Sequence, residues 1–222
     1  MTIAARIQEC ATKLAIGDAE NAFIQLAIAI DGTSKLLYPG NKTSQRCKKF
    51  LKDVLPFILW SLTNGTPAKT TSLSFEISGS SESSTYIEFE DLAYKVMRCS
   101  LLHEGKLSEK VEFVNALYIG TRNGKIQFPL ALIGSLLFAV IASPVNERQR
   151  VSESTSFIFG KTKVPVNHIL GSLEKTKIAI RNGFLYDVDT ACSGLMIPDT
   201  HLGENARHRE VSDDQATPYL YP

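Results

Sequence analysis

The chain has 222 residues, of which 44% are hydrophobic and 21% are charged. A chain of this size and composition buries enough apolar surface to fold without disulfides or a structural metal. Its 24 basic and 23 acidic side chains leave a net charge of +1, which excludes the overall positive field of a strongly basic nucleic-acid-binding protein. Contact with nucleic acid therefore requires a local patch of positive charge.

The four cysteines, at positions 10, 47, 99 and 192, are far apart and form no C-x-x-C pair. Neither a disulfide framework nor a zinc site is expected from this spacing. The first residues mix charged side chains with apolar ones and lack the apolar core of a signal peptide. The longest apolar run, residues 129–144, is shorter than the roughly 20 residues that span a bilayer. We therefore expect a cytoplasmic protein with no metal, no cofactor and no membrane partner.

Apolar residues at three- and four-residue spacing predict helices in the first third of the chain. The stretch 3–37 is interrupted at Gly17-Asp18, where Asp18 is placed to cap a second helix. It is either two helices or one long helix with a break. Residues 44–62 form the next amphipathic helix, with Pro56 as a candidate kink.

Residues 63–88 form a Ser/Thr-rich insertion with one short strand around residues 73–77. Residues 89–104 predict a third helix, and 129–142 predict a buried helix that is apolar on every side. Between these two helices, an Asn123-Gly124 turn predicts a β-hairpin near residues 111–128.

Residues 156–166 are expected to be extended, and 167–181 to form a last helix. The polar stretch 199–222 has the composition of a mobile tail. The fold expected is mainly α. It is a single helical bundle over residues 1–198 with a small β-hairpin insertion, followed by this tail.

One face of the helix over 44–62 is basic and carries Arg46, Lys48, Lys49 and Lys52. This face is a candidate RNA-binding surface, because lysine and arginine contact phosphates. A solvated lysine-rich face is nevertheless the commoner arrangement on a soluble helix. The sequence leaves both interpretations open.

Arg98 and His103 form an R-x4-H pattern at the end of the third predicted helix. Histidine suits proton transfer near neutral pH, and arginine binds phosphate through two parallel hydrogen bonds. Metal-free RNA cleavage needs both functions. Residues five positions apart lie about 140° around an ideal helix, so one pair does not converge unaided. A second copy across a dimer axis would place acid and base in one cleft.

The segment LAYKVMRCSLLHEG, preceded by the helical stretch LAIAIDGTSKLLYP, resembles the HEPN superfamily. The resemblance covers roughly residues 15–142, and only the R-x4-H pattern is specific. It implies a helical bundle, a homodimer, and a metal-independent endoribonuclease of the toxin–antitoxin kind, with an antitoxin as a candidate partner. The catalytic residues it implies are Arg98 and His103, supported by Cys99 and Glu104.

The residue after the arginine is often Asn, Asp or His in nucleases of that superfamily, whereas here it is Cys99. A thiol is a weaker hydrogen-bond partner for His103 than a carboxamide. Two functions therefore stay open: an RNA-cleaving enzyme, and a non-catalytic module that binds nucleotide, RNA or a protein partner in the same cleft. A structural role is the third alternative, with Arg98 paired to Glu104 or Asp91 and His103 at the helix C-terminus.

Overall fold

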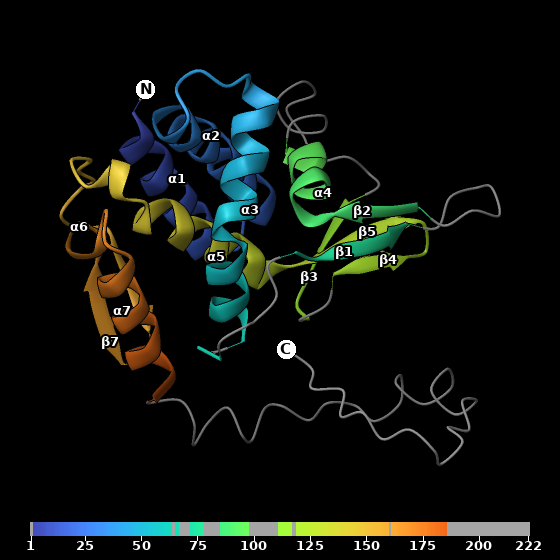
Figure 1. The fold of residues 1–222 in the computed structure, drawn as a ribbon. Coiled ribbons are helices and arrows are strands. Elements are labelled where there is room, and N and C mark those ends of the chain that lie inside the picture. The colour runs from blue at the N-terminus through green and yellow to red at the C-terminus, as the bar shows by residue number, and fades with distance from the viewer. Residues whose placement is uncertain are drawn as a thin grey trace, which may run out of the picture.

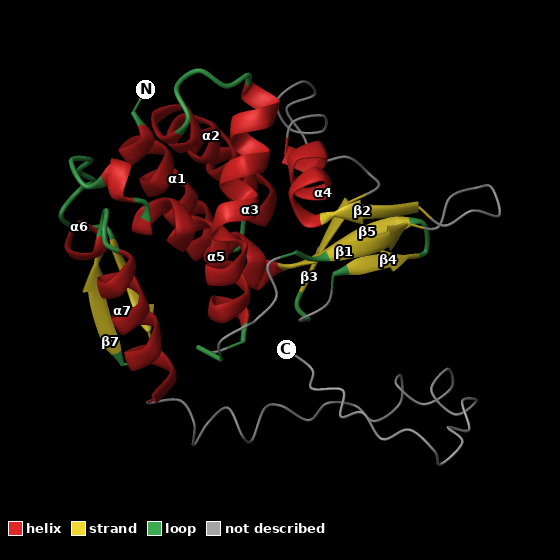
Figure 2. Ribbon diagram, in the orientation of Figure 1, coloured by secondary structure: helices red, strands yellow, loops and turns green. Residues whose placement is uncertain are grey.

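The computed structural model describes residues 2–63, 65–66, 72–77, 85–97, 111–116, 119–159 and 161–185. Helices dominate this part of the chain and gather around α5 (Leu130–Ala142). Figure 2 shows the strands at two separate sides of the helical body. The expectation of a mainly α-helical fold with a small β-hairpin is confirmed.

The first predicted stretch is two helices, α1 (Ile3–Ala15) and α2 (Ala19–Leu37). The chain turns between them at Gly17, whose φ of +76° favours glycine. Asp18 caps α2, since its side chain accepts a hydrogen bond from the Asn21 backbone N–H at 3.2 Å. The two helices then pack against each other.

Helix α3 (Thr43–Leu62) runs through Pro56 and buries one face that includes Phe50, Leu51 and Leu55. Helix α5 is buried almost all round, with nine of its 13 residues inaccessible to solvent. It contacts α1, α2, α3 and α7 (Leu173–Leu185). The uniformly apolar sequence of α5 is thus explained by neighbours on every side.

A buried polar contact fixes the end of α5. The short 3-10 helix η2 (Pro144–Asn146) follows α5 and places Asn146 in the core. The Asn146 Nδ2 donates to the Val140 carbonyl at 2.8 Å and to Thr33 Oγ1 at 3.0 Å. Because Thr33 belongs to α2, this amide ties the end of α5 to α2.

Helix α4 (Phe89–Lys95) is the described part of the helix predicted over residues 89–104, and it packs against α3. Val96 and Met97, the residues that follow, are π-helical and buried. The rest of that predicted helix lies outside the described residues. In the Ser/Thr-rich insertion, β1 (Ser74–Ile77) pairs antiparallel with β2 (Thr85–Glu88). The sequence indicated only the first of these strands.

The predicted Asn-Gly turn joins β4 (Gly120–Arg122) to β5 (Lys125–Pro129). Both turn residues have positive φ, 52° for Asn123 and 73° for Gly124, as a two-residue hairpin requires. The start of the predicted hairpin range, residues 111–114, does not form the first arm of this hairpin. Its strand β3 (Val111–Val114) instead pairs in parallel on the other side of β5. Strand composition alone does not specify which strand becomes the neighbour.

The C-terminal part contains β6 (Ser156–Phe159), β7 (Thr162–Pro165), α6 (Val166–Ile169) and α7. The extended stretch predicted over 156–166 is an antiparallel hairpin. The single helix predicted over 167–181 is split at Gly171, which has a φ of +74°. A Cβ there would lie 2.4 Å from Glu147 Cα, so the close contact also requires glycine. The predicted tail, 199–222, lies outside the described residues.

Candidate anion-binding site

The four residues of the R-x4-H site predicted from the sequence, Arg98, Cys99, His103 and Glu104, lie outside the described residues. The structure describes the helix that leads to them as far as Met97. Asp91, one alternative partner for Arg98, forms an ion pair with Lys48, with 2.5 Å between Nζ and Oδ1. The assignment of a catalytic role to Arg98 and His103 stays a prediction.

The three lysines on the basic face of α3 contact neighbouring residues while staying partly or largely exposed to solvent. Lys48 pairs with Asp91 of α4, and Lys52 Nζ lies 3.5 Å from Glu90 Oε1 of the same helix. Lys49 Nζ lies 4.7 Å from the centre of the Tyr38 ring at the end of α2. These cations connect α3 to its neighbours, a role that the sequence did not indicate. Their contact with RNA stays a prediction.

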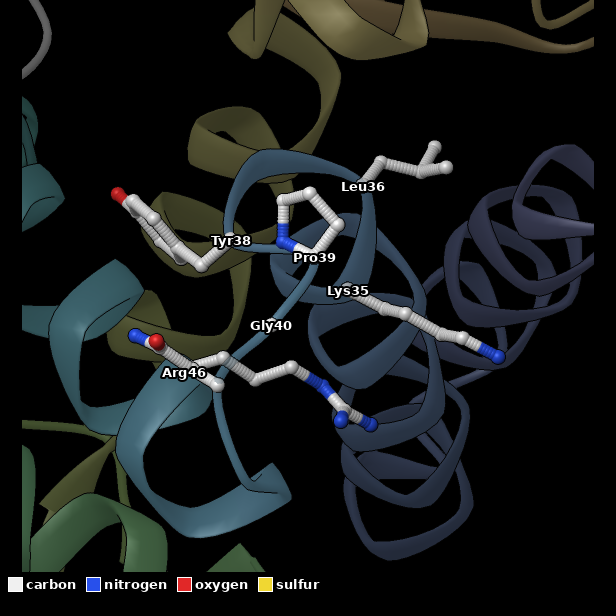
Figure 3. Close-up of a pocket in the computed structure, with 7 residues that line it drawn as sticks. Lys35, Leu36, Tyr38, Pro39, Gly40 and Arg46 are labelled. Carbon is white, nitrogen blue, oxygen red and sulfur yellow. The ribbon is translucent and has the colours of Figure 1, made fainter.

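The fourth residue of the basic face, Arg46, lies in a different environment, beside a cavity of about 520 Å³. This cavity occupies the corner between the end of α2 and the start of α3 (Figure 3). Its volume is in the range of small-molecule sites, about 300–1,000 Å³. We call it the corner pocket; it is lined by Lys35, Leu36, Tyr38, Pro39, Gly40, Asn41 and Arg46.

The turn that shapes the corner pocket is held at Tyr38, the residue after α2. Its backbone N–H donates to the Ser34 carbonyl at 2.9 Å, and its hydroxyl donates to Asp53 Oδ2 of α3 at 2.5 Å. The Gly40 and Asn41 N–H groups both donate to the Tyr38 carbonyl. The two helix ends are therefore fixed relative to each other without any ligand.

Two cationic side chains extend into this corner on the same side of the turn, as Figure 3 shows for Lys35 and Arg46. Arg46 Nη2 donates to Asp31 Oδ1 at 2.8 Å, which fixes the guanidinium. Arg46 Nε is buried and has no hydrogen-bond partner among the described residues. Lys35 is exposed and forms no ion pair within that part of the chain. Buried polar groups are normally paired, and Arg46 Nε is one of three buried side-chain polar atoms without a partner in the described structure, with Glu90 Oε2 and Asn146 Oδ1.

Two titratable groups around the corner pocket, Tyr38 and Cys47, have raised pKa values. Burial, helped by the hydrogen bond to Asp53, raises the pKa of the Tyr38 hydroxyl. Burial also raises the pKa of the Cys47 thiol, next to Arg46, to about 11. General acid–base catalysis works best with a pKa close to the working pH. The raised pKa values of Tyr38 and Cys47 therefore lie away from that range.

The sequence identified Arg46 as basic and residues 38–40 as a turn. It did not predict that Lys35 and Arg46 line the same pocket. The available signal was Lys35 in the last turn of a helix that ends at Tyr38-Pro39-Gly40. This signal places a cation next to the turn, yet the pocket depends on how α3 returns along α2. No group of three or more His, Cys, Asp or Glu in the described ranges could hold a metal ion. Within these ranges, no helix is long and apolar enough to cross a membrane.

The described structure is a helical body with two cationic side chains lining a pocket at a helix–helix corner. The chain belongs to the Rv1289 family, which matches residues 2–190. No curated protein and no solved structure matches the chain. The matched span includes the corner pocket, α4 and the C-terminal hairpin with α7. The resemblance to the HEPN superfamily stays a prediction.

Proposed function

We propose that this protein is a binding module that holds a phosphate-bearing ligand of nucleotide size in the corner pocket. The observation that carries the proposal is the buried, unpartnered Nε of Arg46, a residue that lines the same pocket as the exposed Lys35. An arginine whose Nη2 is already fixed by Asp31 presents its remaining N–H groups in a set direction. Such a rigid fork matches the oxygens of a phosphate.

The walls of the pocket favour a ligand with an apolar part as well as a phosphate. Leu36 and Pro39 line it, and Leu36 is half exposed although it is a large apolar side chain. A nucleoside placed against these two residues would leave its phosphate near Lys35 and Arg46. Lysine would act as a point charge and arginine as the directional donor. A nucleoside monophosphate is therefore the simplest probe.

The test is calorimetric titration of the purified chain with adenosine 5′-monophosphate and with inorganic phosphate. Hydrogen bonds to charged groups contribute about 1.5–3 kcal/mol, so Arg46→Ala should weaken monophosphate binding about 10- to 100-fold. Lys35→Ala should weaken it less, because an exposed charge is screened. Lys125→Ala, at the exposed turn before β5, is the matched control and should bind normally.

Absence of binding for all four nucleoside 5′-monophosphates and for phosphate at millimolar concentration would refute the proposal. Equal affinities of the wild type and Arg46→Ala would refute it as well. Circular dichroism of each variant separates loss of the site from loss of the fold. Arg46→Lys is the informative intermediate, since it keeps the charge and removes the fork.

A second candidate is metal-independent RNA cleavage by Arg98 and His103 in a homodimer. The observation that favours it is the π-helical conformation of Val96 and Met97 directly before Arg98, because π turns often occur at functional sites. On this hypothesis, single-stranded RNA is cut without divalent metal, leaving cyclic phosphate and 5′-hydroxyl ends.

Loss of one acid–base group typically costs 10²- to 10⁴-fold, so His103→Ala should abolish cleavage while Arg46→Ala should not. An inactive wild type that gains activity from Cys99→Asn would support a HEPN-like fold adapted to binding. A strict monomer in light scattering, together with no cleavage of a varied RNA panel, would exclude this candidate.

A further inference from the structure

Positive charge is concentrated in one part of the fold, the C-terminal unit made of β6, β7, α6 and α7 (residues 156–185). This unit holds five of the 24 basic residues of the chain and one of its 23 acidic residues. It therefore carries a formal charge of +4, and the remainder of the chain carries −3. The near-neutral total thus hides a segment of net positive charge, and local positive charge is what contact with a polyanion requires.

The hairpin of the C-terminal unit has two different faces. On one face, Phe157 and Phe159 contact Phe138 of α5, with ring centres 4.9 and 5.4 Å apart. On the other face, Ile158 lies directly across from Lys163 in the strand register and is 75% exposed. The inner face anchors the hairpin to the core, and the outer face is left to solvent.

Helix α7 lies beside the hairpin, as Figure 1 shows, and contacts both of its strands. Its buried side includes Thr176, Ala179 and Ile180, whereas Lys175 and Arg181 are exposed. Arg181 and Lys177 lie over the Trp60 ring, and Lys177 also pairs with Glu174 at 3.6 Å. Among the described residues, three exposed lysines of the unit have no ion-pair partner: Lys161, Lys163 and Lys175.

An anionic membrane surface and a nucleic-acid strand both attract such a patch, and the apolar residues distinguish them. A helix that binds a membrane surface needs a continuous apolar face turned outward. The apolar face of α7 is already buried against the protein, and Phe157 and Phe159 point inward. Ile158, Leu173 and Ile178 are exposed, and a few exposed apolar side chains are ordinary on a protein surface. The patch fits a phosphodiester backbone better.

We propose that the outer surface of the C-terminal unit, through Lys161, Lys163 and Lys175, binds the phosphodiester backbone of a nucleic-acid strand. This surface goes beyond the corner pocket, uses different elements and does not depend on it. Binding by backbone contacts is insensitive to base sequence and strongly dependent on salt, because each phosphate contact releases counterions. The proposal therefore predicts a slope as well as an affinity.

The experiment measures the fluorescence anisotropy of a labelled 20-nucleotide oligouridine and of oligothymidine, from about 50 to 200 mM salt. Each phosphate contact on a single strand contributes about 0.7 to the slope of log K against log salt. The double variant Lys163→Ala/Lys175→Ala should lower the slope by about 1.4 and the affinity about tenfold at low salt. The matched control, Lys125→Ala/Arg148→Ala, removes two exposed cations outside the unit and should keep the slope.

The proposal is supported if either strand binds with a salt-dependent affinity that falls in the unit variant and not in the control. Comparison of oligouridine with oligothymidine shows whether the surface prefers RNA or DNA. No binding of either strand at 50 mM salt overturns it, as does an unchanged slope in the unit variant. Co-sedimentation with phosphatidylserine vesicles through the same lysines, without strand binding, also overturns it in favour of a lipid surface. The unit variant should bind nucleoside monophosphate like the wild type, since Lys163 and Lys175 do not line the corner pocket, so failure here and failure of the corner pocket are told apart.

Discussion

Helix α3 meets α2 and α4 through polar side chains in both cases, but the two contacts differ in exposure. At α2, Ser34 and Cys47 are buried, and Arg46 is mostly covered where it pairs with Asp31. At α4, Lys48 and Asp91 are each more than 40% exposed where they pair. The same helix therefore uses similar residue types in a dry contact and in a wet one.

This difference decides which cation is available to a ligand. In the wet contact, solvent screens the pair of Lys48 and Asp91. Glu90 of the same helix differs, because it is buried and its Oε2 has no hydrogen-bond partner among the described residues. In the dry contact, a donor without a partner stays unsatisfied, and Arg46 Nε is in that position. The three lysines on the basic face contact neighbouring residues. Of the four cations on this face, only Arg46 has a buried donor without a partner in the described structure.

The largest expected effect is the loss of folding stability at high pH that follows from ionisation of Cys47 in the dry contact. Burial raises the pKa of this thiol from 9.0 to about 11. The unfolded chain loses the proton first, so this stabilisation is complete below pH 9 and is lost as the pH rises through 11. Two pKa units correspond to about 2–3 kcal/mol. Urea denaturation of the wild type and of Cys47→Ser at pH 8 and pH 11 should reveal this difference.

The hydroxyl of Cys47→Ser does not titrate in this range, so the variant isolates the thiol from the lysines and tyrosines that also ionise. Cys10→Ser should behave similarly, since burial raises the pKa of Cys10 to about 12. If the stability gap between the wild type and Cys47→Ser is the same at both pH values, the contact between α2 and α3 is not dry.

A smaller effect is expected from Asp31, the acid that fixes Arg46. Asp31→Asn keeps an oxygen that accepts the Arg46 hydrogen bond and removes a negative charge next to the corner pocket. Coulomb repulsion of a bound phosphate then falls, and solvent exposure of the carboxylate limits the gain. Affinity for a nucleoside monophosphate should rise about three- to tenfold in calorimetric titration.

Asp53→Asn is the control for that measurement. Asp53 lies on α3, accepts a hydrogen bond from the Tyr38 hydroxyl and does not line the pocket. Its affinity should equal that of the wild type. A drop in affinity for Asp31→Asn would mean that the carboxylate is needed to orient the guanidinium more than its charge opposes the ligand.

Local signals in the sequence predicted the helices well. Asp18 marks the start of α2, and uniform apolarity marks α5 as the surrounded helix. The Asn123-Gly124 pair placed a two-residue turn correctly, because its positive φ values are a local requirement. Pairing was harder: β3 joins β5 in parallel, a choice made by packing between distant segments.

The candidate site was less predictable than the fold, since its parts are ordinary in isolation. Arg46 and Lys48 belong to one basic stripe in the sequence, and only the position of α4 separates them. Lys35 is 11 residues from Arg46. The two line the same pocket because the turn at Pro39 and Gly40 reverses the chain. The R-x4-H pattern gave a chemical hypothesis for Arg98 and His103, and it stays one.

The smallest expected effect tests the wet contact itself. Lys48 and Asp91 approach to 2.5 Å, which suggests a strong pair, yet both side chains are more than 40% exposed. Exposed ion pairs contribute about 0.2–1 kcal/mol because water screens them and two long side chains must be ordered. A double-mutant cycle with Lys48→Ala and Asp91→Ala, followed by urea denaturation, should give a coupling energy in that range. Raising the salt concentration should reduce it further. A coupling energy above about 2 kcal/mol would instead place this pair among the buried ones, and the distinction between the two sides of α3 would fail.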